Sequence, residues 1–144
     1  MALETPTPGA RWDMRALRAG GGVALMFAIP FAVVARILTD GGAAGNKHSS
    51  WSAPLFLASL LGFFFGAAVA AWHQNRDTPL THAIVAASGT YVIVQTIIIV
   101  ANIILERQVR WLSIIFTLTV VTAVGLFGGL IGRAMRQSGL EPKQ

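Results

Sequence analysis

The chain contains no cysteine among its 144 residues, and few of its residues are charged. The lack of cysteine excludes disulfides, thiolate metal sites, catalytic thiols and palmitoylation, and it leaves the redox compartment open. Charged residues make up 12% of the chain, whereas soluble domains usually contain about a quarter. This composition indicates a chain whose surroundings are largely apolar.

Acidic residues are absent from the long apolar stretches. All six lie outside them: Glu4, Asp13, Asp40, Asp77, Glu106 and Glu141. A pump or multidrug exporter generally binds its proton or cation at an intramembrane carboxylate, so proton-coupled transport is disfavoured. The hydroxyl side chains within the stretches have no His, Asp or Lys beside them, and no phosphate-binding glycine loop occurs. We therefore expect no enzyme, no cofactor and no metal.

What the chain does contain is long uncharged stretches, and hydrophobic residues make up 54% of it. A helix rises about 1.5 Å per residue, so roughly 20 residues cross about 30 Å of hydrocarbon. Four stretches are of about this length: Ala19–Ala35, Trp51–Trp72, Ala83–Leu105 and Trp111–Gly132. The first exceeds the core of a signal peptide, roughly 7–15 residues, so we expect it to stay as a helix.

The predicted fold is an all-α membrane protein, a four-transmembrane-helix bundle. The transmembrane domain covers residues 19–135, with spans at about 19–38, 51–72, 79–105 and 111–133. Residues 1–18 and 136–144 are predicted to be cytoplasmic tails. Thr78 and Pro79 are expected to be the N-cap and first position of the third helix.

The distribution of basic residues predicts the orientation, because Lys and Arg accumulate on the cytoplasmic side of membrane proteins. With four spans, one side holds Arg11, Arg15, Arg18, Arg76, Arg133, Arg136 and Lys143. The other holds Arg36, Lys47, Arg107 and Arg110. Both termini are therefore expected to be cytoplasmic. Tryptophan side chains favour the headgroup layers, and each Trp flanks a span and is expected to anchor it there: Trp12, Trp51, Trp72 and Trp111.

Small residues recur four positions apart in the second and fourth spans. In lipid, such spacing lets helix backbones approach closely. The expected packing positions are Gly62, Gly66, Ala70, Gly125, Gly128, Gly129 and Gly132. A smooth pore wall is the alternative role for these glycines. Similar residues also recur between the two spans at a constant offset, which indicates either two similar helical hairpins or convergence on small-residue packing.

Polar residues in the third span follow a heptad-like spacing. Ser88, Tyr91, Gln95 and Asn102 are expected to share one helix face, with about 20° of drift per heptad. A Gln facing lipid near mid-membrane is costly, so this polar stripe should face protein or water. Hydrogen bonding between helices is the favoured interpretation, and a hydrophilic path is the alternative.

Two histidines, His73 and His82, bracket the turn after the second span, and Asp77 lies between them. A metal site there is one interpretation, but no ligand spacing requires it and histidines are common at membrane interfaces. The formal charge of +5 comes from Lys and Arg that flank apolar spans, so we expect no nucleic-acid partner.

The segment from Gly62 to Tyr91 combines Gly-x-x-x-Gly, a short basic turn, Pro79-Leu80-x-His82-Ala83 and an aromatic residue. In these features it resembles the small four-span membrane proteins of Gram-positive bacteria. That family has no established activity, so the resemblance implies a membrane fold and no catalytic residue.

Together, these patterns predict a multi-pass protein of the bacterial plasma membrane. Its expected role is that of a non-enzymatic accessory or assembly subunit that packs against partner membrane proteins. The alternative is a subunit of an oligomeric channel or transporter. The expected partners are the lipid bilayer and either further copies of the chain or a larger membrane complex.

Overall fold

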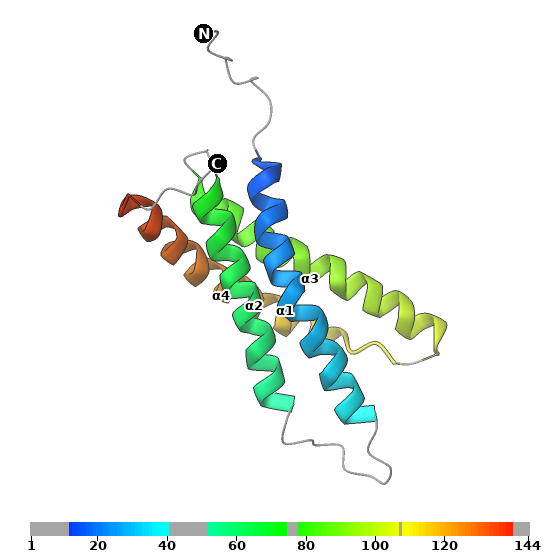
Figure 1. Ribbon diagram of the computed structural model, residues 1–144. Coiled ribbons are helices and arrows are strands. Elements are labelled where there is room, and N and C mark those ends of the chain that lie inside the picture. Colours follow the sequence, from blue (N-terminus) through cyan, green and yellow to red (C-terminus); the bar gives the residue numbers. More distant parts are fainter. Residues whose placement is uncertain (1–11, 41–51, 75–77, 107, 140–144) are drawn as a thin grey trace.

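The computed structural model shows four α-helices connected in sequence order (Figure 1). They are α1 (Met14–Asp40), α2 (Ser52–His73), α3 (Pro79–Ile104) and α4 (Trp111–Gln137). The structure describes residues 12–40, 52–74, 78–106 and 108–139, without the side chains of residues 32, 35–40 and 52. The prediction of an all-helical protein is confirmed. Within this part of the chain, α2, α3 and α4 are long and apolar enough to cross a membrane.

Helix α1 begins at Met14, before the expected boundary at residue 19. The reason is an N-cap that the sequence analysis missed. The Oδ1 atom of Asp13 accepts hydrogen bonds from the backbone N–H groups of Arg15, at 3.0 Å, and Ala16, at 3.1 Å. These bonds satisfy donors that the start of a helix leaves without partners. Residues 14–18, expected in a tail, therefore form the beginning of α1.

Helix α4 continues to Gln137, past the expected end of its span at residue 133. It ends where Gly139 adopts a φ of 76°, a left-handed conformation that glycine accommodates without strain. The N–H group of Gly139 donates to the carbonyl oxygen of Arg136 at 3.2 Å and closes the helix.

Helix α3 begins at Pro79, as the Thr78-Pro79 pair predicts. The Thr78 side chain, however, makes no capping hydrogen bond to the helix backbone. Its Oγ1 atom lies 3.2 Å from Nδ1 of His82. The fixed φ of proline therefore starts this helix without the expected side-chain cap.

Helix α2 packs against all three other helices, most extensively against α1 and α4. The α3–α4 hairpin crosses the α1–α2 hairpin (Figure 1). Helix α3 also packs against α1 and α4, while the described residues of α1 and α4 do not pack against each other. One end of the bundle, the basic end, holds the starts of α1 and α3, the ends of α2 and α4, and Arg15, Arg18, Arg133 and Arg136.

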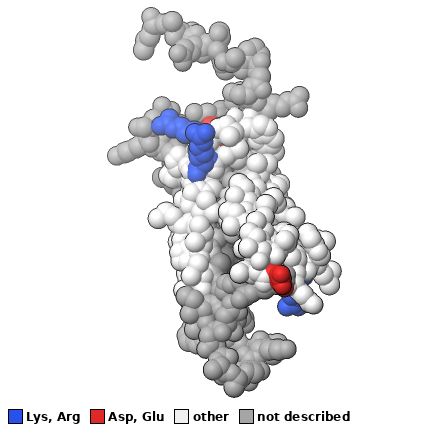
Figure 2. Space-filling view, turned by 90° about the vertical axis from the view of Figure 1, so that its right-hand side faces the viewer, with Lys and Arg blue, Asp and Glu red and all other residues white. Residues whose placement is uncertain are grey.

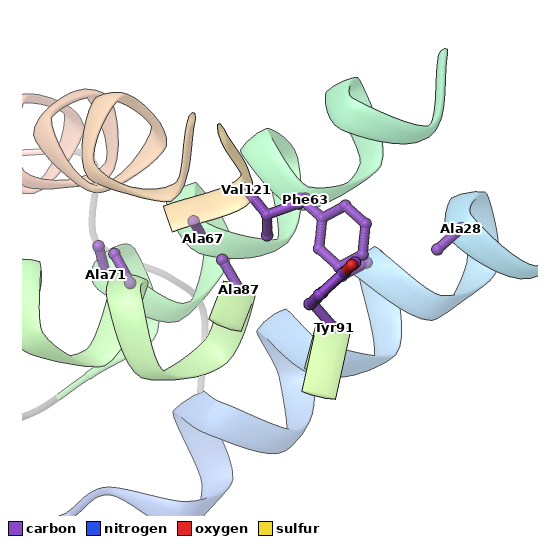
Figure 3. Packing of buried hydrophobic residues seen from close by; sticks show 9 residues of the cluster. Ala28, Phe63, Ala67, Ala71, Ala87, Tyr91 and Val121 are labelled. Carbon is purple, nitrogen blue, oxygen red and sulfur yellow. The ribbon is translucent and has the colours of Figure 1, made fainter. Parts of the chain in front are cut away.

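The core is built mainly from small residues (Figure 3). Phe63 and Tyr91 are its aromatic members, and their rings pack edge-on with centroids 6.3 Å apart. The remaining members are Ala24, Ala28, Ala67, Ala71, Ala83, Ala87 and Val121. Large apolar side chains lie outside, and Leu112 is 83% exposed. Soluble proteins bury their large apolar residues, so this distribution is typical of helices that pack within lipid.

Candidate functional site

The first candidate region is the contact between α1 and α2, where Gly62, Gly66 and Ala70 lie buried. A Cβ atom added to Gly66 would lie 2.5 Å from the carbonyl oxygen of Gly20 and 2.8 Å from Cβ of Ala24. A Cβ atom on Gly62 would meet the side chain of Phe27. The two backbones thus approach too closely for any side chain at these two glycines.

The glycines of α4 divide into two stripes that contact different helices. Gly125 and Gly129 face α3, where added Cβ atoms would lie 2.8 Å from Cβ of Ala87 and 2.6 Å from Cβ of Ala83. Helix α4 is therefore held against α3 by close backbone approach.

The second stripe, Gly128 and Gly132, faces α2. Added Cβ atoms there would meet the carbonyl oxygens of Phe64 and Ala68. Helix α4 is thus wedged between two neighbours. None of the seven expected packing residues lines the polar cleft or the basic cavity described below, so the placement of these residues favours packing over a pore wall.

The two hairpins pack in the same register. Gly66 of α2 meets Gly20 and Ala24 of α1, whereas Gly129 of α4 meets Ala83 of α3. The step in residue number from Gly66 to Gly129 equals the step from Gly20 to Ala83. The contacts of Gly62 with Ala24 and of Gly125 with Ala87 are related by that same step. This correspondence extends the repeat to α1 and α3, and it supports two similar hairpins.

The four polar residues expected to form a stripe on α3 do not line one common surface. The Ser88 hydroxyl donates to the carbonyl oxygen of Ile84 in its own helix, at 2.6 Å. The Tyr91 hydroxyl donates to the carbonyl oxygen of Ile114 in α4, at 3.1 Å. Gln95 and Asn102 line a cleft of about 350 Å³ together with Tyr91. Three of the four stripe residues therefore meet at one site, and the fourth, Ser88, does not line it.

This polar cleft lies between α3 and α4 at the end of the bundle opposite the basic end. Phe56 of α2 also lines it, and the remaining lining residues are Gln108, Val109, Arg110, Ser113, Ile114 and Thr117. Ala83, Ala87 and Val121, each fully buried, fill the bundle on the far side of Tyr91. The cleft is therefore closed at its inner end, and within the described residues no polar path runs through the bundle.

The tryptophans expected as interface anchors lie at helix ends where the structure describes them. Trp12 and Trp72 lie at the basic end, and their rings pack edge-on against His82 and His73, with centroids 5.7 and 5.0 Å apart. Trp111 begins α4 at the opposite end and is 62% exposed. Trp51 lies outside the described residues.

His82 is fully buried at the basic end and uses both ring nitrogens in hydrogen bonds. Its Nε2 atom accepts from the backbone N–H of Asp13, at 2.9 Å. Its Nδ1 atom lies 2.9 Å from the carbonyl oxygen of Thr78. This network assigns the neutral tautomer with the proton on Nδ1, which donates to Thr78. Both nitrogens are occupied, so the geometry favours a structural role for His82 over metal binding.

The described residues contain no group of three His, Cys, Asp or Glu side chains that could hold a metal ion. The Nδ1 atom of His73 lies 3.2 Å from the carbonyl oxygen of Val69 in its own helix. Asp77, the third member of the metal-site alternative, lies outside the described residues.

A basic cavity of about 570 Å³ lies between the start of α3 and the end of α4, and the sequence analysis missed it. Its lining residues are Thr78, Pro79, Leu80, Thr81, Arg133, Arg136 and Gln137. The Nη1 atom of Arg136 donates to the carbonyl oxygen of Gln74, at 2.9 Å. The sequence shows two arginines near the end of the last helix, Arg133 and Arg136. The residues that form the cavity with them, Thr78 to Thr81, come from a distant part of the chain.

The Gln74 side chain lies beside this contact and is 1% exposed. Among the residues that the structure describes, neither its Nε2 nor its Oε1 atom has a hydrogen-bond partner. A buried amide without partners is unfavourable by about 1–3 kcal/mol. Burial of the Gln74 amide therefore lowers the stability of the fold.

No family model matches the chain, and neither the curated proteins nor the solved structures contain a match to it.

Proposed function

We propose that the chain is a four-span protein of the bacterial plasma membrane, with both termini in the cytoplasm. On the face shown in Figure 2, charged side chains gather near the two ends, and the described surface between them is uncharged. Helix α1 packs along α2, contains the uncharged stretch Ala19–Ala35 and exposes Met26 and Val33, so it fits the same apolar layer as the other three helices. The four described arginines of the basic end support its cytoplasmic placement.

Single-cysteine labelling tests this orientation cleanly, because the chain has no native cysteine. A cysteine at Gly45 should react with a membrane-impermeant maleimide in intact cells, whereas one at Gln144 should react only after lysis. The reverse pattern would show that the termini face outwards.

Within the membrane, the proposed role is a non-enzymatic accessory or assembly subunit. The observation that carries this role is the closed polar cleft, which is flanked by uncovered apolar faces of α3 and α4. Exposed apolar residues on these faces include Ile103, Leu112 and Phe116. Lipid chains offer no hydrogen bonds to Gln95 and Asn102, whereas a polar side chain on a partner helix does. A partner helix seated over the cleft would therefore satisfy both its polar and its apolar parts.

The hydroxyl side chains of the spans support a role without catalysis. Each of four donates to the carbonyl oxygen four residues earlier in its own helix, at 2.6–3.0 Å. The four are Ser88, Thr96, Thr119 and Thr122. A hydroxyl nucleophile needs a base within hydrogen-bond reach, and among the described residues these four hydroxyls reach only a helix carbonyl.

Photo-crosslinking in native membranes tests the accessory role. A benzophenone amino acid at Ile103 or Leu112, beside the cleft, should give one discrete adduct with a different membrane protein. The same group at Val33 or Phe65, exposed on α1 and α2, serves as the matched control and should react mainly with lipid. Adducts that contain only further copies of the chain would contradict the accessory role.

The second candidate is an oligomeric channel or transporter subunit. It is favoured by the meeting of Gln95, Asn102 and Arg110 in one cleft. Since the cleft of one copy is closed at its inner end, a path would require several copies to assemble around it. Solute flux from the purified chain in liposomes would support this candidate over the accessory role.

A further inference from the structure

Two positively charged side chains gather in the basic cavity at the ends of α3 and α4. Arg133 and Arg136 line it, and no described residue that lines it is acidic. Within the described part of the chain, neither guanidinium is paired with a carboxylate. A cavity with two unpaired cations is complementary to an anion.

Arg136 is held in position before any ligand arrives. Its Nη1 atom donates to the carbonyl oxygen of Gln74 at 2.9 Å, which uses one of the five N–H donors of the guanidinium. The other donors remain for a ligand, and less side-chain entropy is lost on binding than for a freely rotating arginine.

The hydroxyl of Thr78, at the start of α3, is available as a hydrogen-bond donor in the same cavity. Nε2 of His82 accepts from the N–H of Asp13, so the ring proton lies on Nδ1, which is 2.9 Å from the carbonyl oxygen of Thr78. Nδ1 therefore cannot accept the hydroxyl proton of Thr78, although Oγ1 is only 3.2 Å away. The Thr78 hydroxyl, which belongs to the cavity lining, is left free to donate to a ligand.

We propose that this cavity binds the phosphate group of an anionic phospholipid. Arginines and a hydroxyl match the oxygens of a phosphate, and basic pockets between membrane helices on the cytoplasmic side bind such headgroups. The basic end of the bundle is where the headgroup layer would lie. The proposal rests on the membrane location argued above but not on the accessory role.

Native mass spectrometry of the full chain in detergent tests the proposal, with phosphatidylglycerol and phosphatidylcholine as probes. The unaltered protein should retain phosphatidylglycerol about tenfold more strongly than phosphatidylcholine, and the double variant Arg133→Gln/Arg136→Gln should lose this preference. The control Arg15→Gln/Arg18→Gln removes the same charge from the same end, outside the cavity, and should keep it. Equal loss in both double variants would overturn the site, because charge alone would then explain binding.

Two further measurements test the contribution of Arg133 by itself and distinguish a lipid headgroup from free phosphate. Arg133 is exposed and makes no described hydrogen bond within the chain. The single variant Arg133→Gln should therefore weaken lipid retention without disturbing the fold. Unchanged retention would overturn the site. Inorganic phosphate should not displace the lipid at equal concentration, and displacement would identify free phosphate as the ligand in place of a headgroup.

Extraction with alkaline carbonate separates failure of the site from failure of the membrane location. A protein that stays in the membrane pellet but shows no lipid preference would overturn the lipid site alone. Release into the supernatant would overturn the location on which the proposal rests.

Discussion

Nε2 of His82 accepts a hydrogen bond from the backbone N–H of Asp13 at 2.9 Å, although the two residues are 69 positions apart in the sequence. The bond joins the entry of α1 to the first turn of α3, so it links the two hairpins at the basic end. The ring of Trp12 covers the same histidine. A side chain that the sequence presents as an interfacial or metal-binding histidine therefore acts as a structural tie between helices.

Replacing His82 by Leu should lower the free energy of unfolding by about 2–4 kcal/mol, because the Asp13 N–H and the Thr78 carbonyl would lose their buried partner. Unfolding in detergent, followed by tryptophan fluorescence, measures the change. The matched control is His73→Leu, which removes a 3.2 Å contact within one helix and the edge-on packing against the neighbouring Trp72, and it should cost at most about 1 kcal/mol. Equal effects of the two substitutions would show that the link to Asp13 contributes nothing.

Alanine scanning of the glycines should give effects of opposite sign at contact and open positions. Gly66→Ala should lower the free energy of unfolding by about 1–3 kcal/mol, because the new Cβ would lie 2.5 Å from the Gly20 carbonyl oxygen. Gly89→Ala should raise it by up to about 1 kcal/mol, since nothing lies within 4 Å of that position and alanine favours the helix. Thermal unfolding in detergent distinguishes the two outcomes. Tolerance of alanine at Gly66 would mean that α1 and α2 are not in close contact.

Cysteine labelling should reveal whether the polar cleft contains water. Cysteines at Gln95, Asn102 and Ser113 should react with a small water-soluble reagent in membranes if water fills the cleft, while one at Ser88, which does not line it, should stay protected. Ile97 is 66% exposed but faces away from the cleft, so a cysteine there should be shielded by lipid.

The labelling pattern also bears on the two candidate functions. Protection of all cleft positions in native membranes, followed by reactivity in the purified chain, is the outcome expected for a cleft covered by a partner subunit. Reactivity of all cleft positions in native membranes, together with flux from the purified chain, would instead favour the channel.

Replacing Gln74 by Met should raise the free energy of unfolding by about 1–2 kcal/mol, because the amide is buried with no partner among the described residues and Met is of similar size. The contact with Arg136 uses the Gln74 backbone carbonyl, so it should survive the change. The control Gln137→Met alters an exposed amide and should have little effect on the unfolding midpoint. A lower midpoint for the Gln74 variant would show that water or another group satisfies this amide.

The sequence by itself determined the helices and the small residues that let them approach. Hydropathy and tryptophan positions place the helices, and the Thr78-Pro79 pair locates the start of α3. Helix formation and apolar length depend on residues near one another in the chain, so local patterns are enough to predict them. The Asp13 cap was also a local signal, a favoured capping residue directly before α1.

Only the tertiary structure decided which helix each small residue meets and which polar groups come together. Gly128 and Gly129 are neighbours in sequence, yet one contacts α2 and the other α3. The correspondence between Gly20 and Ala83 was hidden because close packing requires only that both be small. The contacts of His82 with Asp13 and of Arg136 with Gln74 join distant segments, so no local pattern contains them. Such partners depend on how the hairpins cross, and that crossing is set by the packing of the whole bundle.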